Sequence, residues 1–203
     1  MSTTNPTSTP HLQTKKPATT DSAYKPLFAV DYHVYINHTD AGGIVYHANH
    51  LVFFENCRRD WFTSLGFDTY FLKTEDGQIQ HFVVNQVELQ YRKAIFLDEI
   101  ISVRIDKIEL KPASIIFHQS IHRNFSAQNY PNVDVSDPKV SLLSRAKIVI
   151  ACVQNETKEH KTANQVHNNT TMASSAAPIR PIRVPQQLQS MIEQAILQQG
   201  REE

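Results

Sequence analysis

The sequence has little cysteine and no excess of charge of either sign. Its two cysteines, Cys57 and Cys152, each lie in an apolar segment rather than in a paired framework, which argues against a disulfide-stapled secreted domain. We expect both to be small core residues. The 203-residue chain balances 20 Lys and Arg against 20 Asp and Glu, so its formal charge is zero. Because nucleic acid is bound through a net basic field, it is not an expected partner.

Long apolar runs and several well-known catalytic motifs are also missing. The longest apolar runs, such as residues 148–153, fall far short of the roughly 20 residues that a membrane-spanning helix needs, so no integral membrane segment is expected. The first 24 residues contain no apolar core segment and no cleavage site, which favours a cytoplasmic location. No Gly-x-Ser-x-Gly, Gly-x-x-x-x-Gly-Lys or Gly-x-Gly-x-x-Gly motif occurs, which argues against serine hydrolases, P-loop proteins and Rossmann folds.

Two segments with few large apolar residues bracket the ordered part of the chain. They are rich in Thr, Ser, Asn, Gln, Ala and Pro, and such compositions bury too little surface to offset the entropy of ordering. We therefore expect a disordered tail at 1–24, one domain at 25–155, a low-complexity insert at 156–178, and a C-terminal helical extension at 179–203 that packs on the domain.

The spacing of apolar residues predicts a strand followed by a long helix. Strict alternation from Phe28 to Ile36 is typical of a half-buried strand. From Leu51 to Leu65, apolar residues recur at i, i+3 and i+4, which predicts an amphipathic helix. Asn49 is the predicted N-cap of this helix, and Gly66 is the predicted residue that ends it.

Four more strands and a short helix are predicted downstream. The strands centre on residues 83–91, 101–105, 115–121 and 142–152, and the first places Val83 on one face with Val87. Short links favour antiparallel pairing, and residues 124–139 are predicted to form a long loop. Apolar residues at helical spacing behind Pro185 predict the last helix. The fold class is α+β, with one antiparallel sheet packed on one central helix.

The junction between the first strand and the long helix, residues 38–50, concentrates the reactive groups. Gly42 and Gly43 let the backbone turn tightly and approach a ligand, while the helix start presents unpaired N–H groups. Such donors can stabilise an oxyanion, and Asp40 can act on the polarised carbonyl as a base or a nucleophile. From the pattern alone, the favoured interpretation is that Asp40 is a loop residue that caps a turn.

The same junction carries a specific resemblance to a known family. The residues concerned are Thr39-Asp40-Ala41-Gly42-Gly43-Ile44-Val45-Tyr46-His47-Ala48-Asn49, then Phe53-Phe54-Glu55, Arg58 and Leu65-Gly66-Phe67. This pattern closely resembles the hot-dog acyl-CoA thioesterases of the 4-hydroxybenzoyl-CoA thioesterase (YbgC-like) family. The resemblance covers roughly residues 26–155 and 179–199. It implies a hot-dog fold, in which a curved, antiparallel five-stranded sheet wraps around one long central helix, with a short C-terminal helix.

The resemblance also implies an activity and a set of site residues. The chain is expected to hydrolyse acyl-CoA thioesters to a free acid and a thiol, with Asp40 as the catalytic carboxylate. Asp40 either activates a water or attacks directly, and the sequence leaves both routes open. The backbone N–H that polarises the thioester carbonyl falls at His47. The expected substrate-binding residues are Gly42, Gly43, Tyr46 and Phe54. No metal and no cofactor are expected.

Partners follow from the same resemblance. Acyl-CoA is the expected substrate, acyl carrier protein is an alternative thiol carrier, and a role in lipid metabolism is implied. The chain is expected to form a homodimer or homotetramer, with the acyl chain at the interface. Phe53 and Phe54 are adjacent and cannot both face one sheet, so at least one is expected to meet a partner or ligand. His38, Asn85 and the missing proline near Ala94 depart from the family pattern and leave the substrate and nucleotide contacts open.

Several alternatives compete with this interpretation. His33, His38, His47 and His50 suggest a metal site, but they lack a dedicated ligand spacing. Hot-dog enzymes of another subtype place their carboxylate on the helix, which makes Glu55 a candidate. Pairing of Glu55 with an arginine three or four residues on, Arg58 or Arg59, is the favoured interpretation. The basic residues Arg92, Lys93 and Lys111 either contact nucleotide phosphates or are solvated. A non-catalytic module that binds acyl thioesters is the alternative function.

Overall fold

The computed structural model describes residues 25–67, 72–73, 79–124, 138–155 and 179–199. The predicted tail, the predicted insert and most of the predicted 124–139 loop lie outside these residues. In chain order, the elements are β1 (Phe28–His33), the 3-10 helix η1 (Ile36–His38), α1 (Asn49–Ser64), β2 (Leu72–Lys73), β3 (Ile79–Tyr91), β4 (Ile100–Lys111), β5 (Ser114–Arg123), α2 (Pro138–Ser141), β6 (Leu142–Asn155), β7 (Ile179–Pro181) and α3 (Gln186–Gln199).

A seven-stranded antiparallel sheet forms the framework of the molecule. Its order is β1-β4-β5-β6-β3-β2, and β7 pairs with β6. The five strands of six or more residues, β1, β3, β4, β5 and β6, are those that the alternation predicts. The strands β2 and β7, of two and three residues, add to the five expected strands, because segments so short carry no readable alternation. The four-residue helix α2 occupies the end of the predicted loop.

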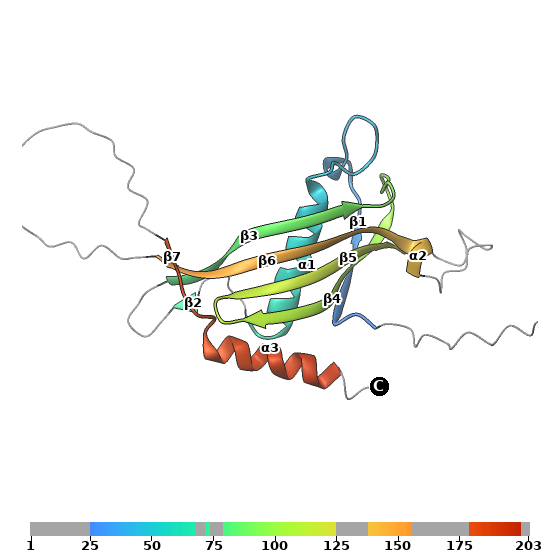
Figure 1. Cartoon of the computed structure of the whole chain (residues 1–203). Helices are drawn as coiled ribbons and strands as arrows, with labels where there is room; N and C mark the ends of the chain where they lie inside the picture. Colours follow the sequence, from blue (N-terminus) through green and yellow to red (C-terminus); the bar gives the residue numbers. More distant parts are fainter. Residues whose placement is uncertain (1–24, 68–71, 74–78, 125–137, 156–178, 200–203) are drawn as a thin grey trace, which may run out of the picture.

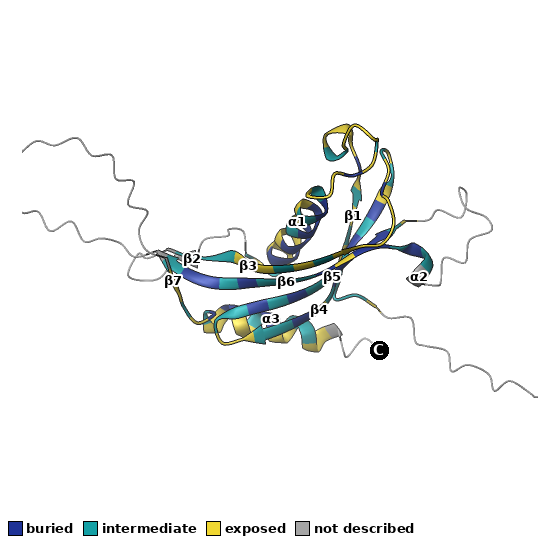
Figure 2. Ribbon diagram, turned by 45° about the horizontal axis from the view of Figure 1, so that its top comes forward, coloured by how far each residue is buried: buried dark blue, intermediate teal, exposed yellow. Residues whose placement is uncertain are grey.

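The sheet curves around α1, as Figure 1 shows, and α3 lies below β4 and β5 in the view of Figure 2. The sheet face toward α1 supplies most of the core. Its fully or nearly fully buried members include Val103, Ile105, Phe117, Ile121, Ile148 and Cys152. Burial of this much apolar surface on both helix and sheet is the main favourable term that holds the two layers together. The predicted arrangement of one curved sheet around one long helix is therefore confirmed.

The C-terminal end of α1 is the end that the sequence predicts. Gly66 has a φ of 87°, a conformation that costs glycine little. Its N–H donates to Thr63 O at 2.9 Å, and the N–H of Phe67 donates to Phe62 O at 3.0 Å. These two bonds form a Schellman motif, which satisfies carbonyls that the helix end would otherwise leave open.

The N-terminal end of α1 differs from the prediction. Asn49 is the first helical residue rather than the N-cap, and the cap position, Ala48, makes no side-chain cap. The Asn49 Nδ2 group instead donates to His38 O at 2.7 Å. Asparagine is common at caps because its oxygen can accept from the helix amides, but here its donor end ties the helix to the preceding chain.

Both adjacent phenylalanines of α1 are buried, contrary to the sequence argument. Phe53 is 2% exposed and Phe54 is 0% exposed. Phe53 packs beside the sheet, with its ring centroid 5.9 Å from that of Tyr32 in β1 and 4.9 Å from that of His38. Because β1 and the chain that follows it curl around the side of α1, the helix is covered over a wider arc than a flat sheet would allow. Neither ring is left for a partner.

A β-bulge changes which residues of β3 face the helix. The pairing of β3 with β6 shifts register between Val84 and Gln86. An extra residue in one strand reverses the side-chain alternation beyond it. Phe82, rather than Val83, therefore shares the core face with Val87. The prediction that Val83 and Val87 lie on one face is wrong for this reason.

The helix α3 adds buried side chains to the same core. Leu188 and Ile192 are 1% and 0% exposed, at the helical spacing that the sequence shows. The chain leading into α3 is anchored at the β4–β5 turn, where Val184 N–H donates to Pro112 O at 2.9 Å. Pro185 immediately precedes the helix, and its carbonyl accepts the first helical hydrogen bond. No helix in the described part of the chain is both long and apolar enough to cross a bilayer.

Candidate active site

The predicted catalytic junction folds as a small three-stranded ribbon beside the main sheet. Residues 38–40 and 44–46 pair as a tight hairpin, in which Asp40 N–H donates to Ile44 O at 2.9 Å and Tyr46 N–H donates to His38 O at 3.0 Å. Residues 95–97 form the third strand, which is bridged to Ile44 through Phe96. The turn of the hairpin is therefore held by backbone bonds on both arms.

The Asp40 carboxylate sits at the tip of this hairpin. The N–H of Gly42 donates to Asp40 Oδ1 at 2.8 Å, and a Cβ on Gly42 would approach that oxygen to 3.1 Å. Gly43 has a φ of 73°, which favours glycine at the position that completes the turn. Asp40 is exposed, and in the described part of the chain no side chain or backbone group donates to its Oδ2. One oxygen is therefore positioned by the turn while the other can face a reactant.

The start of α1 leaves a backbone donor open close to the hairpin. Among the described residues none accepts a hydrogen bond from the N–H of His47, whereas the His47 carbonyl accepts one from Tyr91 OH at 3.0 Å. The side chain of His47 is exposed and packs against Tyr46 in a tilted arrangement, with the ring centroids 4.3 Å apart. An open amide at a helix start combines a hydrogen-bond donor with the positive end of the helix dipole.

A buried histidine lies directly behind this helix start. His50 is 4% exposed, its Nδ1 lies 3.0 Å from Ser144 Oγ, and its ring meets Tyr91 edge-on at 5.0 Å. Burial, reinforced by the neighbouring His47, lowers the pKa of His50 to about 4. A neutral His50 therefore anchors the first turn of α1 to β6, while Tyr91 of β3 fixes the His47 peptide.

The structure brings together three of the four predicted substrate-binding residues. Gly42, Gly43 and Tyr46 belong to the hairpin, and Tyr46 is 45% exposed. Phe54 lies in the core, where its ring reaches no solvent and its carbonyl accepts from Gln119 Nε2 at 3.2 Å. The geometry around Asp40 thus includes the two glycines and one exposed aromatic ring.

The competing carboxylate, Glu55, is paired away from the hairpin. It forms an ion pair with Arg58, three residues on. The Arg58 guanidinium is 2% exposed and also donates from Nη1 to Gln119 Oε1 at 2.7 Å. The favoured interpretation of Glu55, pairing along the helix, is therefore confirmed, although the burial of its arginine partner was not predicted.

The histidines that suggested a metal site are distributed over several contacts. His38 Nδ1 accepts the N–H of Tyr35 at 2.9 Å, which closes the turn of η1, and burial lowers the His38 pKa. His33 lies 3.7 Å from Asp98 at the end of β1. In the described ranges, no group of three or more His, Cys, Asp or Glu residues could hold a metal ion.

The three basic residues considered for nucleotide phosphates each have a protein partner. Arg92 donates to Gln90 Oε1 at 2.9 Å, Lys93 Nζ donates to Val140 O at 2.6 Å, and Lys111 lies 3.6 Å from Glu109. None of them belongs to the Asp40 hairpin.

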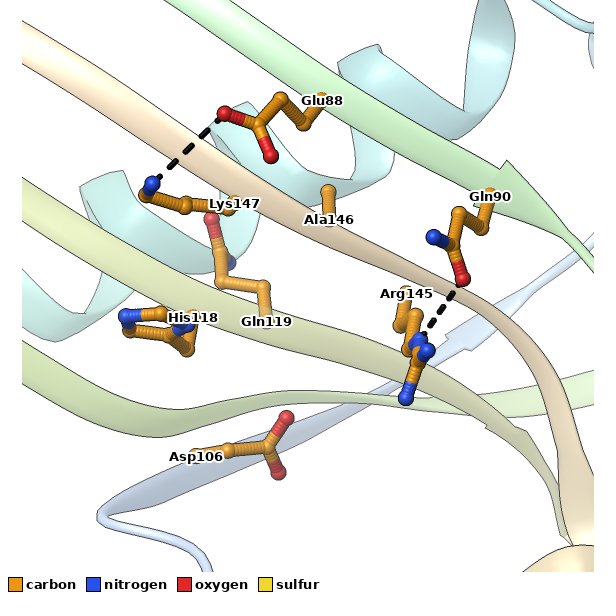
Figure 3. A pocket seen from close by; sticks show the side chains of 8 residues that line it. All are labelled: Glu88, Gln90, Asp106, His118, Gln119, Arg145, Ala146 and Lys147. Atoms are coloured by element: carbon orange, nitrogen blue, oxygen red, sulfur yellow. Dashed lines mark hydrogen bonds and ion pairs between the residues drawn. The ribbon is translucent and has the colours of Figure 1, made fainter.

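A polar depression of about 310 Å³ lies on the sheet face that points away from α1 (Figure 3), and none of its lining residues belongs to the hairpin. It is lined by Glu88, Gln90, Asp106, His118, Gln119, Arg145, Ala146 and Lys147. Several of its side chains are partnered within it, since Lys147 lies 3.5 Å from Glu88 and Arg145 Nε donates to Gln90 Oε1 at 2.9 Å. This pattern is typical of a solvated sheet surface and does not indicate a catalytic site.

The supporting segment at residues 95–97 was not found from the sequence. Val45 N–H donates to Ile95 O at 2.8 Å, and Leu97 N–H donates to Gly43 O at 3.2 Å. A three-residue pairing between distant parts of the chain carries no local periodicity, so the pattern of apolar residues gives no signal for it.

No protein-family model matches the chain, but individual relatives and solved structures do. Acyl-CoA thioesterase YbgC of Haemophilus influenzae is 35% identical over 126 residues, which cover 62% of this chain and 80% of that protein. A crystal structure of a probable thioesterase from Bartonella henselae is 27% identical, with a TM-score of 0.50 over 61% of this chain and 89% of that one. A 4-hydroxybenzoyl-CoA thioesterase in complex with 4-hydroxybenzoyl-CoA has a TM-score of 0.55 at 13% identity, over 80% and 96% of the two chains, and this likeness concerns the fold.

The curved sheet around α1 places the chain among proteins of the hot-dog fold. Within that class, it belongs to the YbgC acyl-CoA thioesterase family, as the similarity to the Haemophilus protein over most of that protein's length shows. The resemblance inferred from residues 39–67 is therefore confirmed, and the chain is an enzyme of the thioester hydrolase class.

Proposed function

We propose that this chain hydrolyses acyl-CoA thioesters to a free carboxylic acid and coenzyme A, and that the hairpin at residues 38–47 carries out the reaction. One observation carries the proposal. The carboxylate of Asp40 is held by the Gly42 amide on the same hairpin that leads to the open N–H of His47. A fixed carboxylate and an open helix-start donor are the two groups that thioester hydrolysis needs.

The chemistry follows from the positions of these groups. The thioester carbonyl oxygen accepts a hydrogen bond from His47 N–H, which stabilises the charge that develops on it. Asp40 then either removes a proton from the attacking water or bonds to the acyl carbon itself, and the carbon–sulfur bond breaks. In the second route, water hydrolyses the mixed anhydride and regenerates the carboxylate. Thiolate is a good leaving group, so neither route needs a strong general acid.

The proposed binding surface consists of Gly42, Gly43 and Tyr46. The glycines present no side chain to a thioester that approaches Asp40, and the exposed ring of Tyr46 offers an apolar contact beside it. Phe54, expected at this surface, is assigned to the core because its ring is fully buried. Acyl-CoA is the proposed substrate, with acyl carrier protein as the alternative carrier of the same thioester group.

A second copy of the chain is the proposed partner, as a homodimer or homotetramer. The outer edge of β3 pairs with β2 only at Ile79 and Gln80, so most of this long strand leaves one edge open within the described residues. Around the hairpin, Tyr35, Ile36 and Phe96 are 57%, 73% and 50% exposed. An open edge and an exposed apolar surface are features that subunit contacts cover. Pairing of two copies would enclose the exposed carboxylate.

The proposal extends to the organisation of the chain and its location. We assign residues 25–155 to the hydrolase domain and 179–203 to a helical extension packed on it, with 1–24 as a tail and 156–178 as an insert. The site residues of the proposal all fall within the first of these ranges. A cytoplasmic enzyme of lipid metabolism fits these assignments.

A thiol-release assay tests the activity directly. The purified 203-residue chain is offered short, medium, long and aromatic acyl-CoA thioesters, and the same acyl groups on acyl carrier protein. Turnover of at least one acyl-CoA is expected, with a preference that identifies the acyl group. Binding of acyl-CoA without thiol release across the panel would instead support a non-catalytic binding module. Light scattering over a dilution series, run on the same samples, tests the assembly, and full turnover by a monomer would contradict it.

A further inference from the structure

The hairpin that carries Asp40 depends on a segment that comes from elsewhere in the chain. Residues 95–97 pair with its second arm, through the bonds from Val45 N–H to Ile95 O and from Leu97 N–H to Gly43 O. The second arm in turn accepts the Asp40 amide at Ile44 O. A shift of residues 95–97 would therefore displace the turn that places the carboxylate.

A single arginine from the end of β5 contacts this segment at three points. Arg123 Nη2 donates to Ala94 O at 2.8 Å and to Glu99 Oε2 at 3.1 Å. Its guanidinium carbon lies 6.0 Å from the centroid of the Phe96 ring. Arg123 thus engages the beginning, the middle and the end of residues 94–99.

Glu99 links Arg123 to the backbone of Phe96. Its Oε1 lies 3.0 Å from Arg123 Nε in an ion-pair contact, and its Oε2 accepts the N–H of Phe96 at 3.3 Å. The two side chains are only 16% and 17% exposed, so solvent screens their attraction less than it would screen that of a surface pair. The planar guanidinium group of arginine, with its several N–H donors, suits this geometry better than the ammonium group of lysine would.

The segment has other attachments, which matter for testing the role of Arg123. Two backbone bonds, from Val34 N–H to Glu99 O and from Asp98 N–H to Val34 O, tie its far end to the chain beyond β1. Loss of the arginine is therefore expected to loosen residues 94–97 locally while the segment stays attached.

From these contacts we infer that Arg123, with Glu99, is a positioning residue for the reaction at Asp40. It does not touch the substrate. It holds residues 94–97 against the hairpin, and so fixes where the Asp40 carboxylate lies relative to the N–H of His47. The inference rests on the proposed function, because it assigns the reaction to that hairpin. Displacements of about 1 Å at a reacting group can reduce rates by up to about a hundredfold.

Two measurements on Arg123→Met test the inference. The expected kcat is about tenfold to a hundredfold below wild type while KM changes by less than about twofold, because positioning and not binding is lost. Amide hydrogen exchange at Val45 and Leu97 is expected to become faster, with exchange in the core strands unchanged. Arg123→Lys keeps the positive charge but lacks the planar guanidinium group, so its kcat should lie between those of wild type and Arg123→Met.

A matched control comes from Arg145, an exposed arginine that donates to Gln90 on the far face of the sheet. Arg145→Met is expected to change neither kcat nor the two amides. Should Arg123→Met fold poorly, Glu99→Gln offers a milder change, with the same direction of effect on the amides and on kcat. Wild-type kcat, or unchanged exchange at Val45 and Leu97 in both variants, would overturn the inference. Since exchange is measured without substrate, an inactive wild-type protein would reject the proposed function alone.

Discussion

Replacement of the buried arginine of α1 tests how the helix is held against the sheet. Arg58 is 2% exposed, donates to Gln119 Oε1 at 2.7 Å and pairs with Glu55. In Arg58→Met, a flexible apolar side chain takes over the packing of the arginine stem, but the polar contacts are lost. The variant therefore isolates the contribution of those contacts to the free energy of unfolding.

The magnitude follows from what each partner loses. The Gln119 oxygen, in a side chain 1% exposed, is left unsatisfied, which costs about 1–3 kcal/mol. Loss of the Glu55 pair adds about 1 kcal/mol, because that carboxylate is 34% exposed and returns to water. Removal of Arg58 Nε, a buried group without a hydrogen-bond partner in the described structure, returns about 1 kcal/mol. We expect a net loss of about 2 kcal/mol.

Urea unfolding followed by circular dichroism measures this loss. The protein concentration is held constant, because association would make the midpoint depend on it. Arg59→Met, the exposed neighbour, is the control and should change stability by less than about 0.5 kcal/mol. Arg58→Met combined with Gln119→Leu should cost at least about 1 kcal/mol less than the sum of the two single changes. An additive pair, or a loss below about 0.5 kcal/mol in Arg58→Met, would refute the reasoning.

Three further predictions concern stability and the assignment of the carboxylate. Burial lowers the pKa of His50 and His122 to about 4. Because the unfolded chain then binds more protons, stability should fall between about pH 6.5 and pH 4, by roughly 3 kcal/mol for each histidine. As the pH is lowered, the urea midpoint of His122→Asn should fall less than that of wild type. Burial raises the pKa of Asp106, so this carboxyl group contributes a change in stability of the opposite sign over the acidic part of the range. Asn49→Ser should destabilise as much as Asn49→Ala, by about 1 kcal/mol in thermal melts, because a cap former cannot replace the tether. Glu55→Gln should keep the wild-type kcat per folded molecule; a hundredfold loss would move the catalytic carboxylate to α1.

The framework of the fold was predictable because its elements are long. Strands of 10 to 14 residues and a helix of 16 residues repeat their apolar spacing several times, so the period is unambiguous. The stop at Gly66 was predictable for a related reason, since the φ it needs is one that favours glycine. The pairing of Glu55 with Arg58 followed from helical spacing alone.

Other features depended on contacts that no local pattern records. The bulge in β3 moves Phe82 to the core face through one extra residue, which sequence alternation cannot locate. Asn49 satisfies the usual preference for a cap, yet a carbonyl 11 positions earlier competes for its side chain. Phe53 is covered because the chain after β1 wraps past the helix, which is a property of the tertiary fold.

The candidate site also combines residues that the sequence predicted with a residue that it did not. Asp40, Gly42, Gly43 and His47 lie within one short motif, so their types and spacing suggested a role before their geometry was known. Arg123 reaches the hairpin only through residues 94–99, and a solitary arginine at a strand end has no distinguishing pattern.

The central claim is that the Asp40 carboxylate performs the hydrolysis. Asp40→Asn keeps the size of the side chain and an oxygen that can accept the Gly42 N–H, so the hairpin should be preserved and the melting temperature should stay close to wild type. The amide is neither a base nor a nucleophile, so kcat with the best acyl-CoA thioester should fall on the order of 10² to 10⁴. The decisive measurement is kcat for thiol release by folded Asp40→Asn beside wild type. A loss of that size is the predicted result, and a kcat near that of wild type would contradict the account.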